Sequence, residues 1–463
     1  MKKCLLALLL LIGAMINAKG QPFANQYMNL LGIWDDPLVP QNTSFVQSRY
    51  ASCWGWTDTL TNRNYAIIGS SLGTHIIEVT DPQNPVERDY VPGRRNNVLW
   101  REYKSYGNYL YMISDDNSPN SFQIADMSFL PDSVHVVYDS DTLFRQSHTL
   151  YVAGDKLYTA NPKKIGVNKS MGVYSLANPA VPSLLRYLND DYPAINQVHD
   201  MLVINDTVYA NCGFDGLHVY TFSNGVFNEL SSLNISSSAN YNHSCAIDKT
   251  HRYLYYCDEV PTGQPNIIVD LNDINNIQSI GSFIEHPGST PHNPYVEGDL
   301  LYIAYYQEGL LVYNIVDPQN PILVAYFDTY SDNAVGAYDS PAYKGAWAAY
   351  TFSNTGHTVV SDMQRGLFVL ELDLPTAVTT PAPLKVATYP NPATDLIKVM
   401  VTNGSGECSY KLINMQGQIA LKGEARQGIF NVNVQSLAGG LYNLEVIQGK
   451  ESFRSRILIN PTW

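Results

Sequence analysis

A pattern of alternating apolar and polar positions recurs along most of the chain, and one copy is "VHDMLVINDTVYANCGFDGLHVYTFSNG" at 198–225. Two short apolar runs flank a turn at Asn205-Asp206, and a strand led by Gly216 follows them. Gly and Asn tolerate the positive φ angles that two-residue hairpin turns demand, so Gly154-Asp155 and Gly298-Asp299 read as turns of the same kind. Each copy therefore predicts a hairpin followed by a third strand.

The third strand is recognisable seven times. Its copies begin at Gly73, Ser121, Gly172, Gly216, Pro265, Gly309 and Gly366. A fourth strand follows, as in "PILVAYFDT" from Pro321. Four short antiparallel strands repeated at about 40 to 50 residues are typical of a β-propeller blade. The sequence predicts an all-β protein whose larger part is a seven-bladed β-propeller.

The last copy lacks a fourth strand, because the chain runs from Asp373 directly into "LPTAVTTPAP". The stretch "YMNLLGIWDD" from Tyr27 has the character of that missing strand. We expect residues 27–34 to pair beside residues 366–373. The N-terminal segment would then complete the last blade and cover its open edge.

Composition narrows the class of partner. The 463 residues are 45% hydrophobic and 15% charged, with 33 tyrosines and a net charge of -14. Few charges and many tyrosines favour β structure. Nucleic acid and anionic membrane surfaces are excluded as partners, because binding to phosphate needs a basic face.

The N-terminal residues 1–20, "MKKCLLALLLLIGAMINAKG", read as a secretory signal peptide, and no second long apolar stretch predicts a transmembrane segment. Five cysteines remain after it. Cys245 and Cys257 flank a predicted hairpin and could form a disulfide; alternatively all five are small buried residues. We expect a propeller at 21–375, a linker at 376–384 and a C-terminal domain at 385–463.

The propeller motifs resemble a known family. The stretch "GLLVYNIVDPQNPILVAYFD" resembles the LVIVD-type repeat of bacterial surface proteins. With "WGWTD" at 54–58 and "GAWAAY" at 345–350, residues 27–374 look like the choice-of-anchor B family. That resemblance implies an exported domain carried on various C-terminal anchors, and it supplies no biochemical activity.

The C-terminal part is similar to the sorting domain of the type IX secretion system of Bacteroidetes. The resemblance is carried by "YPNPATDLIKV" at 389–399, an N-x-x-G turn at Asn414–Gly417 and a G-x-Y strand at Gly440–Tyr442. It implies that residues 385–463 form a small immunoglobulin-like β-sandwich handled by the type IX machinery. The protein is then expected outside the cell or on the outer-membrane surface.

Histidines recur at one position of the repeat. Counting back nine residues from the position that matches Val208 in each hairpin lands on Trp56, Arg101, His148, His199 and His292. His243 takes this place in the longer fifth hairpin, and Ala348, beside Trp347, in the last. Since the first strand of a blade lies nearest the propeller axis, these residues are expected at one depth around the channel.

Three interpretations of these histidines stay open. The first is a polar binding site for a small molecule or glycan at the channel mouth, built from His148, His199, His243 and His292 with Asp58, Glu102, Asp200 and Asn293. The second is a divalent metal such as zinc, held by the same histidines on neighbouring blades, which could activate water. The third is structural: each histidine bonds to backbone or to a carboxylate of its own blade.

Other candidates are the loop "SDDNSPN" at 114–120, whose oxygens could bind calcium or simply be solvated, and four tryptophans. Trp54, Trp56, Trp100 and Trp347 are expected near the channel mouth, either buried or stacking on sugars.

No nucleophile elbow, P-loop or H-E-x-x-H motif occurs. We therefore favour a binding module for a glycan, a peptide or another envelope component. The alternatives are a metal-assisted hydrolase or lyase and a purely structural surface module.

Overall fold

The structure is a computed structural model, and it describes residues 23–116, 119–234, 240–285, 288–331, 343–374, 386–401, 407–414, 418–425, 428–448 and 451–460. The signal segment 1–20, the linker 376–384, turn residues 415–417 and residues 117–118 of the candidate calcium loop lie outside this part. The chain divides after Leu374 into two compact units. Each unit is described by itself.

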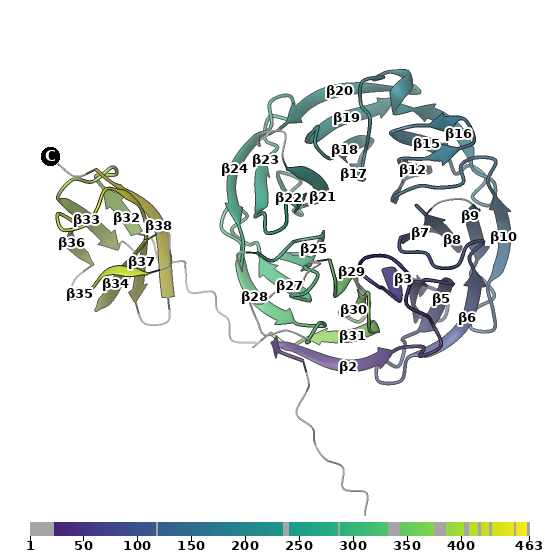
Figure 1. Cartoon of the computed structure of the whole chain (residues 1–463), viewed down its shortest axis with the longest axis horizontal. Helices are drawn as coiled ribbons and strands as arrows, with labels where there is room; N and C mark the ends of the chain where they lie inside the picture. Colours follow the sequence, from purple (N-terminus) through teal and green to yellow (C-terminus); the bar gives the residue numbers. More distant parts are fainter. Residues whose placement is uncertain are drawn as a thin grey trace, which may run out of the picture. The chain divides into compact units, whose positions relative to one another are not determined.

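The larger unit is a β-propeller, in which the described strands form seven sheets arranged in a ring (Figure 1). Each sheet is called a blade below, and its strands are given from the axis outward. The first three blades are β3 (Tyr50–Asp58), β4 (Arg63–Ser70), β5 (Gly73–Glu78), β6 (Val86–Pro92); β7 (Arg101–Tyr106), β8 (Tyr109–Ser114), β9 (Phe122–Asp126), β10 (His135–Ser140); and β11 (Leu150–Ala153), β12 (Lys156–Ala160), β15 (Met171–Ser175), β16 (Ser183–Tyr187).

The other four blades follow in chain order. They are β17 (Asp200–Ile204), β18 (Thr207–Asn211), β19 (Leu217–Ser223), β20 (Val226–Leu233); β21 (Tyr241–Ile247), β22 (Tyr253–Val260), β23 (Asn266–Asp270), β24 (Gln278–Phe283); β25 (Asn293–Glu297), β26 (Leu300–Ala304), β27 (Leu310–Asn314), β28 (Ile322–Phe327); and β29 (Ala346–Thr351), β30 (His357–Asp362), β31 (Gly366–Leu372), β2 (Met28–Trp34). A small ribbon of β13 (Lys163–Lys164) and β14 (Val167–Asn168) and a 3₁₀ turn at Leu188–Asp190 complete the unit.

The two-residue turns predicted from sequence are confirmed at Gly154-Asp155, Asn205-Asp206 and Gly298-Asp299. In each hairpin the residues that flank the turn are paired directly. The first turn residues have φ of +57°, +49° and +63°, a region that Gly and Asn reach at little cost.

The predicted closure of the ring is also confirmed. Strand β2 pairs antiparallel with β31, from Met28 opposite Leu372 to Trp34 opposite Leu367. Just ahead of it, β1 (Asn25–Gln26) adds a fifth strand to the preceding blade by pairing with β28. The Phe23 ring packs against both blades, 5.6 Å from the Phe327 ring and 5.2 Å from the Phe368 ring. The N-terminal segment therefore fastens two blades together.

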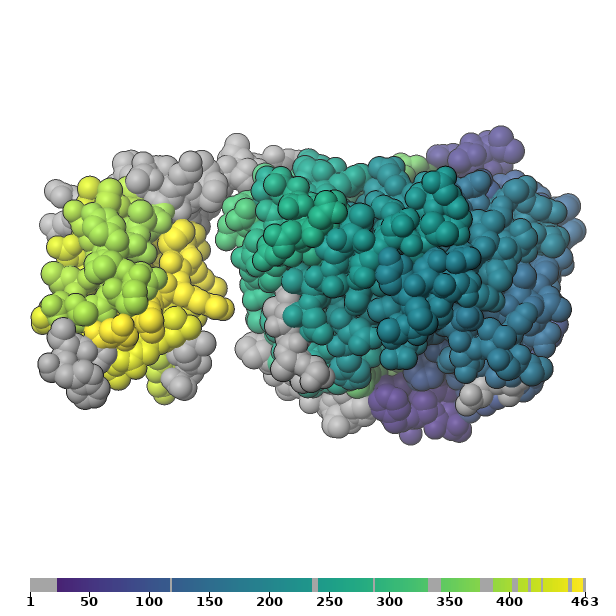
Figure 2. Space-filling view, turned by 90° about the horizontal axis from the view of Figure 1, so that it is seen from above, coloured from purple at the N-terminus to yellow at the C-terminus, as the bar shows by residue number. Residues whose placement is uncertain are grey.

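The hydrophobic core lies between neighbouring blades. One cluster joins Tyr111 and Phe122 of the second blade to Leu157 and Tyr174 of the third, all fully buried. Similar clusters fill the other interfaces, and Figure 2 shows successive blades of the propeller in close contact. A large aromatic side chain contributes about 2–3 kcal/mol when it is buried fully, so these contacts account for much of the stability of the ring.

The disulfide considered for Cys245 and Cys257 is wrong. The two residues lie on the paired strands β21 and β22, but Cys245 is opposite Tyr256 and Cys257 is opposite Ser244. Both thiols are free, and Cys257 Sγ contacts Asn266 Oδ1 at 3.1 Å. The five described cysteines are buried, as the alternative interpretation expected.

The smaller unit contains two sheets around one core. The sheets are β32 (Val386–Tyr389), β33 (Leu396–Val401), β36 (Ile429–Asn433); and β35 (Ile419–Ala425), β34 (Cys408–Asn414), β37 (Gly440–Gln448), β38 (Glu451–Ile459). Val399 of the first sheet and Leu412, Leu444 and Ile457 of the second belong to the same buried cluster. The immunoglobulin-like topology stays a prediction.

Candidate functional site

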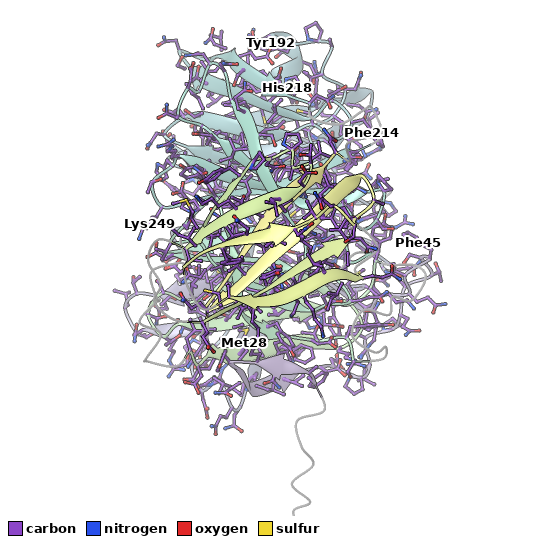
Figure 3. The ribbon with its side chains drawn as sticks, turned by 90° about the vertical axis from the view of Figure 1, so that its left-hand side faces the viewer. Met28, Phe45, Tyr192, Phe214, His218 and Lys249 are labelled. Carbon is purple, nitrogen blue, oxygen red and sulfur yellow. The ribbon has the colours of Figure 1, made fainter. Side chains whose placement is uncertain are left out.

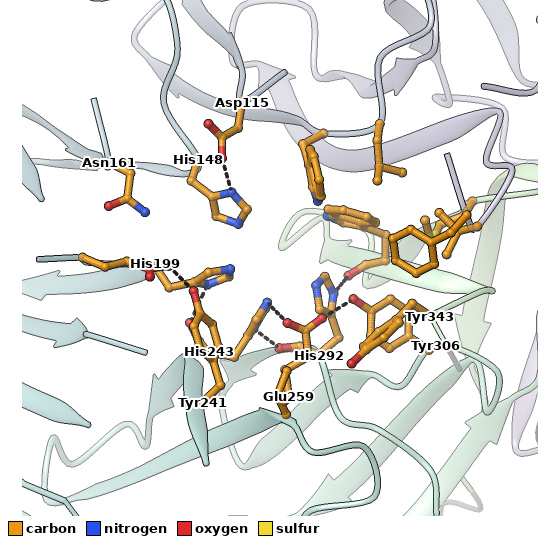
Figure 4. A pocket seen from close by; sticks show the side chains of 18 of the residues that line it. Asp115, His148, Asn161, His199, Tyr241, His243, Glu259, His292, Tyr306 and Tyr343 are labelled. Atoms are coloured by element: carbon orange, nitrogen blue, oxygen red, sulfur yellow. Dashed lines mark hydrogen bonds and ion pairs between the residues drawn. The ribbon is translucent and has the colours of Figure 1, made fainter. Parts of the chain in front are cut away.

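One end of the propeller carries a cavity of about 590 Å³ (Figure 4). Its lining comes from the starts of inner strands, the ends of second strands and the loops beside them. The charged and polar members are Asp115, His148, Asn161, Lys163, Asn196, Gln197, His199, His243, Glu259 and His292. The four histidines that share one repeat position therefore meet in a single cavity.

The four imidazoles form a continuous row across four neighbouring blades. Ring centroids are 4.1 Å apart for His148 and His199, 4.1 Å for His199 and His243, and 4.4 Å for His243 and His292. The Trp347 ring continues the row, 5.0 Å from the His292 ring. Each ring touches the next because each is carried by the same position of adjacent inner strands.

Three of these imidazoles have a fixed orientation. The Nδ1 atom of His199 bonds to the carbonyl oxygen of His243 at 3.0 Å, that of His243 to His292 at 3.0 Å, and that of His292 to Trp347 at 2.7 Å. A carbonyl oxygen only accepts hydrogen bonds, so Nδ1 must carry the proton. In the neutral ring Nε2 then carries a lone pair and can accept a hydrogen bond or ligate a metal. These bonds agree with the structural interpretation, which expected backbone as one kind of partner, and the carbonyls belong to the next blade.

Burial keeps these three rings neutral. It lowers the pKa of His199 and of His243 well below the usual value, and the neighbouring imidazoles lower both further. Burial also lowers the pKa of His292, to about 3. Removing an imidazolium from water is unfavourable, which is the physical cause of the shifts.

His148 differs from the other three in charge. Its Nδ1 lies 2.9 Å from Asp115 Oδ2, and Lys163 Nζ lies 3.0 Å from Asp115 Oδ1. Burial alone would lower the pKa of His148, but the hydrogen bond and charge of Asp115 outweigh it and raise the pKa. Thus a carboxylate stabilises the protonated form of the imidazole at one end of the row, whereas burial favours the neutral form of the other three.

Sequence reasoning missed Glu259 and Tyr306. Glu259 lies at the end of β22, 3.8 Å from His243 Nε2 through Oε2, and its Oε1 accepts a 2.7 Å hydrogen bond from the Tyr306 hydroxyl. Burial raises the pKa of Glu259. Asp115 and Glu259 both stand five residues after the leucine that follows the hairpin turn, Leu110 or Leu254. The two acidic residues therefore occupy the same position of the repeat. This was visible in the sequence, but by itself it indicated only a repeated structure.

The rim of the cavity is aromatic. Phe45 and Phe214 are 64% and 50% exposed, and they come from loops on the same face of the propeller, opposite the face that carries Lys249 (Figure 3). Phe214 packs edge-on against Tyr241, and Phe45 against Tyr343. Exposed rings above a polar floor offer flat apolar surfaces to a ligand.

Glu102, Asp200 and Asn293 lie on inner strands but do not line the cavity. Asn293 Nδ2 donates to the Trp347 carbonyl at 3.0 Å, and Asp200 Oδ1 accepts from Thr149 Oγ1 at 3.0 Å. Glu102 Oε1 accepts from Trp347 Nε1 at 2.9 Å. Burial raises the pKa of both carboxyls, and the charge of Lys104 opposes the shift.

The placement of Asp58 and Trp56 at the channel mouth with the histidines is wrong. The first hairpin has a longer turn, and its inner strand β3 begins at Tyr50, so positions 56 and 58 fall near the other end of the blade. Asp58 is instead part of the turn, where Oδ1 accepts from the Leu60 amide at 2.9 Å. Arg101 lies at the start of its inner strand, as expected. Its Nε, however, donates a 2.8 Å hydrogen bond to the Ser70 carbonyl of the preceding blade.

The remaining candidates divide between cavity and packing. Trp100 and Trp347 line the cavity, whereas Trp54 packs against Tyr350 and Trp56 against Tyr65. In the candidate calcium loop, Asp116 Oδ2 accepts the amides of Leu99 and Trp100 at 3.0 and 3.1 Å. Asp115 is paired with His148 and Lys163. Both described carboxylates of this loop, Asp115 and Asp116, therefore already have partners within the protein.

Fold and cavity define a β-propeller with a histidine-lined pocket at one end, followed by a second β unit. Residues 387–460 of that unit match the family model described as a secretion system C-terminal sorting domain. Such a domain is handled by the type IX secretion system, and it indicates export to the cell surface or outside. Within the described part of the chain we find no helix with the length and apolar character needed to span a bilayer.

Solved structures similar to this chain are propeller proteins of low identity. They include PorZ, a surface component of the type IX secretion system of Porphyromonas gingivalis (12% identity, TM-score 0.45, 86% of this chain and 58% of that one). A protein from Lactobacillus plantarum (11%, 0.49, 82% and 98%) and a putative 6-phosphogluconolactonase from Bacteroides uniformis (12%, 0.47, 83% and 99%) are also similar. This chain thus spans little more than half of PorZ. No curated protein matches.

Proposed function

We propose that this protein is an exported binding module whose propeller takes an extracellular ligand, a glycan or a polypeptide, into the histidine-lined cavity. The observation that carries the proposal is the build of that cavity. An aromatic rim with Phe45 and Phe214 exposed surrounds a floor of oriented polar groups, including His199, His243 and Glu259. Concave sites with apolar walls and a few convergent polar groups are the usual form of a ligand site.

The polar floor supports selectivity. Three imidazoles that are neutral and held by backbone carbonyls present acceptors, while His148 is hydrogen-bonded to the carboxylate of Asp115. Acceptors with fixed directions discriminate between ligands by their hydroxyl or amide donors, since a mismatched ligand leaves a buried polar group without a partner.

We further propose that residues 27–374 are a choice-of-anchor B domain with LVIVD-type repeats, on the motifs quoted above. A metal-assisted hydrolase or lyase is the alternative function, and it depends on a metal in the same cavity. The sorting domain supports attachment to the surface or release outside in either case.

The test is direct binding of residues 21–463 to a glycan array that includes bacterial surface polysaccharides, and to a peptide library. We expect selective binding to one class of ligand. A Phe45→Ala/Phe214→Ala variant should bind at least about tenfold more weakly, since each stacked aromatic contributes of the order of 0.5–1.5 kcal/mol and two are removed. Phe129→Ala is the matched control, because Phe129 is 46% exposed, stacks on His135 and lies outside the cavity. Binding that the rim variant leaves unchanged would contradict the proposal.

A further inference from the structure

Three potential metal-ligating atoms converge on the cavity floor. Among the described residues, the imidazoles of His199 and His243 and the carboxylate of Glu259 each offer one atom, and these atoms lie within 4.8 Å of one another. His243 Nε2 and Glu259 Oε2 are 3.8 Å apart. With bonds of about 2.1 Å, the ligand atoms of a tetrahedral site lie roughly 3.4 Å apart. Small side-chain movements therefore bring the three atoms to ligating distance.

We propose that His199, His243 and Glu259 bind one divalent transition-metal ion, with zinc the ion that suits two imidazoles and a carboxylate best. His199 precedes β17, His243 lies in β21 and Glu259 lies near the end of β22, so two neighbouring blades supply the ligands. His243 and Glu259 are positioned by strands, and His199 immediately precedes one. The site stands on this geometry and does not depend on which ligand the rim accepts.

The groups behind the ligands support the assignment. A histidine that ligates through Nε2 almost always donates its Nδ1 hydrogen to a carbonyl or carboxylate, and ligating carboxylates are themselves hydrogen-bonded. Here His199 donates to the His243 carbonyl and His243 to the His292 carbonyl, both at 3.0 Å. Tyr306 holds Glu259 Oε1 at 2.7 Å, which leaves Oε2 turned toward His243. The arrangement has the hydrogen-bonded support of a metal site already in place.

The other two histidines of the row have different roles. The His148 Nδ1 is bonded to Asp115, which also pairs with Lys163, and His148 is not part of the convergent group. His292 packs against the Tyr306 ring at 4.4 Å and is not part of the convergent group. Three protein ligands would leave at least one further coordination position for the ion. That is the pattern of zinc sites that accept an exogenous ligand.

The experiment uses residues 21–463 freed of metal by a chelator and titrated with Zn²⁺ by calorimetry and with Co²⁺ by visible absorption. We expect one ion per chain and a Co²⁺ spectrum typical of four or five ligands. His243→Asn is the informative variant, because the Asn amide can replace the Nδ1 donor to the His292 carbonyl but has no counterpart of Nε2. It should weaken Zn²⁺ binding at least about 100-fold while the protein still melts cooperatively. Glu259→Gln should weaken it by about 10-fold or more and can keep the Tyr306 bond.

Two controls separate this site from adventitious binding. His218→Asn changes a histidine outside the cavity, paired with Glu229 at 2.8 Å, and should leave Zn²⁺ affinity unchanged. His148→Asn should change it less than fivefold. No stoichiometric Zn²⁺ binding by the folded wild type, or equal binding by folded His243→Asn and Glu259→Gln, would overturn the proposal. Ligand binding that depends on Phe45 and Phe214 but needs no metal would leave the proposed function standing, so the two failures are distinguishable.

Discussion

The imidazole of His199 donates from Nδ1 to the backbone carbonyl of His243, 3.0 Å away, and His243 occupies the same position in the next blade. Because His243 and His292 repeat the contact, a histidine in each of three successive blades is joined to the backbone of the next blade. One atom of each ring supports the propeller, and the other faces the cavity. The structural and functional interpretations of the recurrent histidine thus apply to different nitrogens of the same ring.

This division predicts different outcomes for two substitutions of His199. His199→Asn can keep the donor to the His243 carbonyl, so we expect the free energy of unfolding to change by less than about 1 kcal/mol. His199→Leu leaves that buried carbonyl without its donor and should cost about 1–3 kcal/mol. Chemical denaturation of both variants measures the difference. Equal losses would mean that the hydrogen bond contributes little.

Closure by the N-terminal strand predicts that β2 is essential for stability. Met28 is fully buried in a cluster with Phe327 and Phe368, and Met28→Ala should cost about 2–4 kcal/mol. The neighbouring Asn29 is exposed, and Asn29→Ala should stay within about 0.5 kcal/mol. Thermal unfolding of the two variants provides the comparison. A Met28→Ala protein as stable as Asn29→Ala would contradict the closure.

The Trp347 and Glu102 pair crosses from the last blade to the second inside the channel. Glu102→Gln keeps an acceptor for Trp347 Nε1 and removes a carboxyl whose pKa is raised by burial, so stability should be equal or slightly higher. Glu102→Leu leaves the indole N–H without that acceptor and should cost about 1–3 kcal/mol. Melting curves at neutral pH test the order. A Gln variant less stable than the Leu variant would exclude this explanation.

A buried carboxyl near the closure predicts a pH dependence of stability. Burial raises the pKa of Asp328 from 3.8 to about 7. As the pH rises through about 4, the unfolded state loses this proton first, so stability is lost between about pH 4 and pH 7 and is constant above that range. We expect Asp328→Asn, which keeps an oxygen for the Tyr330 amide, to stabilise the protein at pH 7.5 by about 3 kcal/mol more than at pH 4.5. An equal effect at both pH values would show that the carboxyl is not perturbed.

Repeat phase allowed much of the fold and part of the site to be predicted. The hairpin turns and the pairing of β2 with β31 follow from local patterns, and the cavity position of His148 and His199 follows from one repeat phase on inner strands. The same count misplaced Asp58, because the first hairpin has a longer turn. Glu259 was missed because a common repeat position does not show in which blade that residue lies beside a histidine. Phe45 and Phe214 lie on irregular loops, where no periodicity operates.

The pairing of Met28 with Leu372 also constrains the order of folding during export. Only after the last blade has emerged can the first residues of the propeller find their partner strand. Until then the chain keeps an open ring with an unpaired edge, which is the state most exposed to proteases and to association with other chains. Because the sorting domain follows shortly after that blade, the completed ring and the secretion signal become available within a short stretch of chain. Closure of the ring and completion of the sorting domain thus nearly coincide in the order of synthesis.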